Sequence, residues 1–157
     1  MLLLPMKLSR LFFFAILFVA PTVCAATDRV AAERTWKPFF TEFRVAVKKR
    51  DRAALRKMMS SDFFSSPGND PGIDAAFKYW DDANGQGWRA FNRTLNQGTV
   101  PMAAWWDHGA KRKYITRIAP PAANVRRNID HAHVDYYAFF EFRDGRWYCT
   151  IFSECCD

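Results

Sequence analysis

The sequence predicts an α+β domain in which N-terminal helices pack on an antiparallel sheet. Apolar side chains recur every three or four residues between Trp36 and Leu95, which is the spacing of amphipathic helices. From Val100 onward the pattern changes to the alternation that is typical of strands. Two long strands then flank Asp144-Gly145, a dipeptide that favours a tight hairpin turn. A helical half followed by a strand half indicates this fold class.

The first residues have the three parts of a secretory signal. Lys7 and Arg10 form a short basic region, the run 11–20 is apolar, and small residues follow Pro21. The apolar run is about ten residues long, well short of the ~20 residues that span a bilayer. A cleaved leader therefore explains this segment better than a membrane anchor.

We expect residues 1–25 to be a signal peptide and residues 26–157 to form one extracytoplasmic domain, periplasmic or secreted. The mature chain should begin at Ala26 or Thr27 and contain no membrane span. The whole chain has 23 Lys and Arg against 16 Asp and Glu, and removal of the leader lowers its net charge of +7 by two. Because the basic residues are spread over every segment, we expect a solvated basic surface and no nucleic-acid partner.

The first helix is indicated by an apolar face made of Trp36, Phe39, Phe40, Phe43 and Val47. Pro38 is best tolerated in a first turn, so the helix either starts near Thr35 or is kinked at the proline. Asp51 has the side chain of an N-cap and predicts a second, short helix.

Two further helices follow a turn-rich loop. Ile73, Phe77 and Trp80 form the apolar face of one. Trp88, Phe91 and Leu95 form that of the next, and Gly98 suits a left-handed cap at its end. Residues 102–106 and 113–118 then predict a strand pair joined around His108-Gly109.

The hairpin turn sets the register of the last two strands. The predicted pairs that face the helices are Phe142 with Trp147, Phe140 with Cys149, Ala138 with Ile151, and Tyr136 with Ser153. The opposite face then has an aromatic centre of Tyr137, Phe139, Tyr148 and Phe152. An aromatic centre with a charged rim is the composition of a protein–protein contact, so these four residues are candidates for an interface.

The cysteines of the mature chain differ in their expected state. Cys149 lies on the apolar strand face and is expected to be a buried free thiol. Extended chain separates it from Cys155 by about 20 Å, beyond the reach of a disulfide. Cys155 and Cys156 could form a strained vicinal disulfide, pair between chains, or remain reduced.

Two segments resemble a known family. The stretch FRVAVKKRDRAAL at 43–55 and the following MSSDFF at 59–64 are similar to the opening of NTF2-like domains (the SnoaL and ketosteroid-isomerase superfamily). In these domains a long helix meets a short one at an Asp and runs into a strand. The segment FEFRDGRW at 140–147 resembles their last hairpin, whereas 65–98 departs from them by an extra helix.

The resemblance implies helices on the concave side of a curved antiparallel sheet, forming a cystatin-like cone around a small cavity. Tyr136 and Ser153 are then the candidates to line a pocket for a small apolar ligand. Such domains include enzymes, carriers and interaction modules, and they often dimerise through the sheet. The inward strand face shows neither an acid nor a histidine that could serve as a catalytic base.

Three histidines suggest a different chemistry. His131 and His133 are separated by one residue on a strand and point to one side, which can supply two zinc ligands. His108 would complete a three-histidine site if its turn folds beside this strand.

The resulting expectation is an exported, non-catalytic binding or interaction module that needs no cofactor and forms a homodimer through the outer sheet face. A small proton-transfer or isomerase-type enzyme is the first alternative. A histidine-based metal-binding protein is the second.

Overall fold

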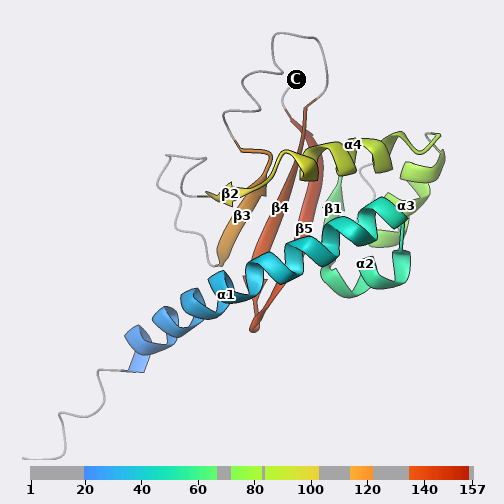
Figure 1. Ribbon diagram of the computed structural model, residues 1–157. Helices are drawn as coiled ribbons and strands as arrows, with labels where there is room; N and C mark the ends of the chain where they lie inside the picture. Colours follow the sequence, from blue (N-terminus) through green and yellow to red (C-terminus); the bar gives the residue numbers. More distant parts are fainter. Residues whose placement is uncertain (1–19, 67–71, 83, 103–113, 122–134, 156–157) are drawn as a thin grey trace, which may run out of the picture.

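The computed structural model describes residues 20–66, 72–82, 84–102, 114–121 and 135–155 (Figure 1). Within these residues the chain is an α+β fold. The helices are α1 (Ala20–Lys49), α2 (Arg52–Met58), α3 (Ile73–Asp82) and α4 (Gln86–Asn96). The strands are β1 (Met59–Ser65), β2 (Val100–Pro101), β3 (Ile115–Ala119), β4 (Asp135–Arg143) and β5 (Arg146–Cys155).

The strands form one open, mixed sheet in the order β1-β5-β4-β3-β2. β1 pairs with β5 in parallel, and the other neighbours are antiparallel. The expectation of a wholly antiparallel sheet is therefore wrong at β1. The long path through α3, α4 and three strands between β1 and β5 is what makes a parallel pairing accessible to this strand.

Helices α1 and α4 lie across one face of the sheet, and α2 and α3 stand beside β1 (Figure 1). α1 continues through Pro38, so the predicted start near Thr35 is wrong and the helix does have an earlier part before the proline. A proline inside a helix removes one backbone hydrogen bond and crowds the carbonyl four residues earlier. Trp36 and Phe43, buried on either side of Pro38, hold the helix on the sheet across this weak point.

The expected helix caps are confirmed. The Asp51 carboxylate accepts a hydrogen bond from the backbone N–H of Ala54 at 3.0 Å and so starts α2. The Asp51 N–H itself donates to the carbonyl of Ala46, 2.9 Å away, which fixes the sharp junction between α1 and α2. Gly98 follows α4 with a φ of 87°, the left-handed conformation expected of it.

The apolar faces predicted for α3 and α4 are confirmed and meet each other. Phe77, Trp80, Trp88 and Phe91 are all buried. The rings of Trp80 and Trp88 lie 4.9 Å apart, edge to face. Gly87 allows this approach, because a Cβ at that position would lie 2.2 Å from a Trp80 ring atom.

The hairpin turn is the predicted one. Asp144 and Gly145 have φ of 51° and 79°, as a two-residue hairpin turn of this hand requires. The pairs Phe142 with Trp147 and Phe140 with Cys149 are also confirmed.

Beyond Cys149 the register shifts by one residue. Phe139 pairs with Ile151, so Thr150 has no partner in the ladder and forms a β-bulge. Ala138 then pairs with Phe152, and Tyr136 with Glu154. The predicted pairs of Ala138 with Ile151 and Tyr136 with Ser153 are wrong for this reason.

The bulge exchanges the faces of the residues that follow it. Phe152 is fully buried on the helix side, where its ring stacks on Phe91 with centres 4.1 Å apart. Its predicted place on the outer face is wrong. Ile151 moves the other way and joins an apolar cluster on the outer face with Phe139 and Ile118.

The shorter strand pair is antiparallel, but its first strand is β2 at 100–101 and not at the predicted 102–106, of which 103–106 lie outside the described residues. Val100 pairs with Ile118 and Pro101 with Arg117. The predicted connection around His108-Gly109 lies outside the described residues.

We predict that Trp147→Ala lowers the free energy of unfolding by about 3–5 kcal/mol. Trp147 is buried, lies 4.6 Å from the ring of Trp36, and donates its indole N–H to the Ala32 carbonyl at 2.9 Å. The substitution removes both the ring packing and the donor. Urea unfolding followed by circular dichroism measures the change, with Phe64→Ala as control because Phe64 is 39% exposed. Equal losses in the two variants would contradict this view of the core.

Candidate functional site

The two residues predicted to line a pocket together, Tyr136 and Ser153, lie on opposite faces of the sheet. Tyr136 packs on the helix side, where its ring lies 5.2 Å from that of Phe152. Ser153 pairs with Tyr137 on the outer side and is buried, with its hydroxyl 3.3 Å from the Glu154 carbonyl oxygen. The bulge at Thr150 causes this separation.

The same bulge brings an acid to the helix side that the sequence did not predict there. The Tyr136 hydroxyl donates a hydrogen bond of 2.7 Å to the Glu154 carboxylate. Burial, this hydrogen bond and the carboxylate charge raise the pKa of Tyr136, so the phenol stays protonated. One feature of the sequence could have indicated the bulge. In a regular strand, the large apolar ring of Phe152 would face outward between polar residues.

The three candidate metal ligands, His108, His131 and His133, lie outside the described residues. Within the part of the chain that the structure describes, no three His, Cys, Asp or Glu side chains gather as a metal site. The histidine site stays a prediction.

Cys149 is the buried free thiol that was expected. Burial raises the pKa of this thiol well above its ordinary value, because the charged thiolate would lose its hydration. Such a thiol is a poor nucleophile at neutral pH.

The outer sheet face holds the remaining interface candidates. Tyr137 and Phe139 lie on it with their rings 5.2 Å apart. They belong to an apolar patch, here called the outer patch, whose described members are Val100, Met102, Ile118, Tyr137, Phe139 and Ile151. Tyr148 lies on the same face, nearer the hairpin turn.

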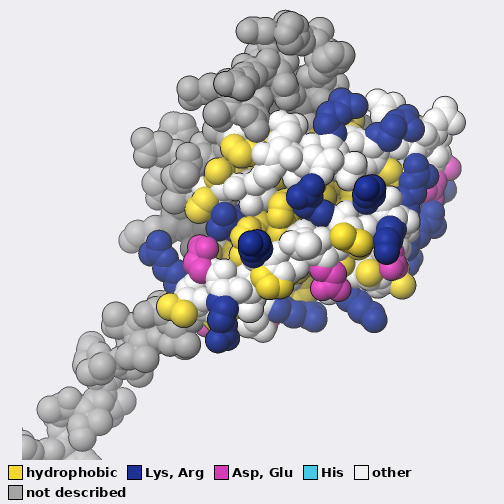
Figure 2. Space-filling view, viewed as in Figure 1, with side chains coloured by type: hydrophobic (Ala, Val, Ile, Leu, Met, Phe, Trp, Pro, Cys, Tyr) yellow, Lys and Arg dark blue, Asp and Glu magenta, His cyan; other side chains and the backbone are white. Residues whose placement is uncertain are grey.

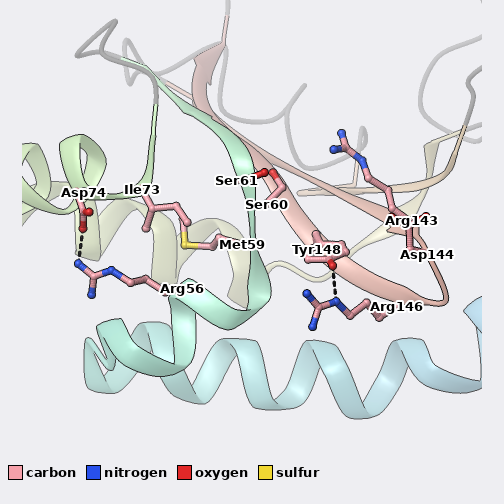
Figure 3. A pocket seen from close by; sticks show the side chains of 10 residues that line it. All are labelled: Arg56, Met59, Ser60, Ser61, Ile73, Asp74, Arg143, Asp144, Arg146 and Tyr148. Atoms are coloured by element: carbon pink, nitrogen blue, oxygen red, sulfur yellow. Dashed lines mark hydrogen bonds and ion pairs between the residues drawn. The ribbon is translucent and has the colours of Figure 1, made fainter.

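A pocket of about 600 Å³ opens at the hairpin end of the sheet, along the edge strand β1 (Figure 3). Its walls come from α2, β1, the start of α3 and the β4–β5 hairpin. The lining residues are Arg56, Met59, Ser60, Ser61, Ile73, Asp74, Arg143, Asp144, Arg146 and Tyr148. We call it the hairpin pocket.

Arg143 joins the hairpin to the neighbouring strand. Its guanidinium reaches both oxygens of Asp62 on β1, at 3.0 and 3.1 Å, and also pairs with Glu141 on its own strand. The guanidinium lies 4.8 Å from the centre of the Tyr114 ring. Because its guanidinium already binds two carboxylates, Arg143 stabilises the wall of the pocket.

Basic side chains are dispersed over the visible surface. Figure 2 shows Lys and Arg scattered between acidic, polar and apolar groups on the face that bears α1 and α4. This distribution agrees with the expected solvated basic surface.

No family model, curated protein or solved structure matches this chain. The resemblance to NTF2-like domains therefore stays a prediction from the sequence motifs. Across the described residues, the helices are all too short or too polar to traverse a lipid bilayer.

Proposed function

We propose that the protein is an exported, non-catalytic interaction module that associates through the outer face of its sheet. The observation that supports this most is the filled space between helices and sheet. A module whose interior is occupied by its own side chains has to bind through its surface.

Aromatic rings occupy the region where a cone-shaped domain would hold a ligand. Phe140, at the middle of β4, lies between 5.3 and 6.1 Å from the ring centres of Trp36, Phe39, Phe40 and Phe43 on α1. At the α4 end, Phe152 fills the corresponding space against Phe91 and Trp80. An apolar ligand would have to displace close-packed rings at a large energetic cost.

The outer patch has the layered composition of an interface. Ile118 and Phe139 are its buried base, whereas Tyr137 and Ile151 are half-buried and reach the surface. Charged side chains such as Arg143 and Glu141 follow on the same face toward the turn. Aromatic and aliphatic groups framed by charge are typical of protein–protein contacts.

Export is proposed from the leader. A cut after Ala25 or Ala26 falls within α1, before Ala31 and Ala32, the first residues of that helix in the described core. Loss of the leader would therefore leave the described core intact.

We predict that the mature protein forms a homodimer. Tyr137→Glu should raise the dimer Kd at least about tenfold, because the substitution would bury a charge in an apolar contact. Sedimentation velocity over micromolar concentrations measures this. Val45→Glu is the control, since Val45 is a 47% exposed apolar residue on α1. A wild-type protein that stays monomeric, or equal effects of both variants, would contradict association through the outer patch.

A second candidate function, proton transfer, is supported by the Tyr136–Glu154 pair. A carboxylate and a protonated phenol within hydrogen-bond distance are the groups that general acid–base chemistry requires. Both residues lie on the helix side of the sheet, where the predicted strand register had placed no acid.

For this second candidate we expect catalysed hydrogen–deuterium exchange next to the carbonyl of a simple ketone, followed by NMR in heavy water. Glu154→Gln removes the base and should reduce the catalysed rate about a hundredfold or more. Glu42→Gln, an exposed acid on α1, should leave the rate unchanged. Exchange no faster than in buffer would exclude the activity for that ketone class.

A further inference from the structure

The hairpin pocket contains three arginines, and their partners differ. Arg143 is bound to Asp62 and Glu141, and Arg56 pairs with Asp74. No carboxylate of the described residues lies within 4 Å of the Arg146 guanidinium. Arg146 is therefore the cation of this pocket whose charge remains available.

Arg146 is exposed, and its side chain contacts Tyr148 two residues along the same strand. Its Nε donates a hydrogen bond to the Tyr148 hydroxyl, and its guanidinium lies 4.4 Å from the centre of the Tyr148 ring (Figure 3). This contact uses Nε and leaves the two terminal nitrogens free to donate. A guanidinium oriented in this way binds the two oxygens of a carboxylate or phosphate group with little loss of side-chain entropy.

The rest of the pocket adds polar and apolar contacts. Ser60 is buried, and its hydroxyl makes no hydrogen bond of ordinary geometry, but it lies close enough to the Asp62 carboxylate to lower the pKa of that group. Ser61 next to it is exposed and also lines the pocket. Ile73, which is half-buried, and the edge of Met59, which is otherwise part of the core, are the apolar groups of the pocket (Figure 3).

We propose that the hairpin pocket binds a small amphiphilic anion. Its carboxylate or phosphate head lies on Arg146, and its short apolar body lies against Ile73 and the exposed edge of Met59. A volume of about 600 Å³ is in the range of small-molecule sites. Asp144 also lines the pocket and, like Arg146, is exposed, so water screens both charges.

The test uses the mature protein with four probes: octanoate, octyl phosphate, octanol and inorganic phosphate. Titration calorimetry gives the Kd, and the side-chain Nε–H signal of Arg146 in proton–nitrogen NMR reports the contact. We expect octanoate or octyl phosphate to bind at millimolar concentration or better and to shift that signal. Octanol, which lacks the charge, and inorganic phosphate, which lacks the apolar body, should each bind at least about tenfold more weakly. The stronger of the two amphiphiles identifies the head group.

Arg146→Gln should weaken binding of the preferred amphiphile about tenfold or more, because it removes the paired donors and the charge. Arg146→Lys keeps the charge but not the planar fork, and should recover only part of the affinity. Arg34→Gln, an exposed arginine on α1 outside the pocket, is the matched control and should bind like the wild type. Unchanged binding in Arg146→Gln, equal binding of octanol, or no binding of either amphiphile would each overturn the proposal. These outcomes do not depend on dimer formation, which sedimentation measures separately.

Discussion

The extra residue at Thr150 in β5 determines how the rest of the domain is arranged. Without it, the regular alternation set by the hairpin turn would continue to the end of the strand. With it, Phe152 turns toward the helices and completes the aromatic layer with Phe91 and Trp80. Ile151 turns outward and extends the outer patch. The Thr150 hydroxyl lies 3.5 Å from the Phe139 carbonyl, a contact that fits the bulged geometry.

The two faces of the sheet that the bulge defines differ in packing and polarity. Between helices and sheet, rings from α1, α3, α4 and the hairpin pack closely against one another. At one end of that layer, Tyr136 and Glu154 form an isolated polar pair. The outer face is apolar toward β2 and β3 and becomes polar toward the hairpin, where Arg146 remains unpaired among the described carboxylates. The surface therefore offers two separate kinds of contact, one apolar and one anionic.

Local rules predicted much of this structure, and long-range pairing explains what they missed. The cap at Asp51, the turn at Asp144-Gly145 and the helical faces depend on neighbouring residues, so the sequence reveals them. The bulge and the parallel pairing of β1 depend on which distant segments meet, and no local pattern encodes that choice. The continuous helix through Pro38 is a tertiary effect, since packing outweighs the local penalty. The hairpin pocket combines three stretches that lie far apart in the sequence, so no local pattern predicts it.

The register of β5 is tested most directly by aromatic NOEs in an NMR spectrum of the mature protein. The rings of Phe91 and Phe152 have centres 4.1 Å apart, so strong cross-peaks between their ring protons are expected. Ile151 should instead show contacts with Phe139 and none with Phe91. Cross-peaks between Ile151 and Phe91, with Phe152 free of helix contacts, would mean that the strand continues without a bulge. That result would contradict the placement of Phe152, Glu154 and the outer patch together.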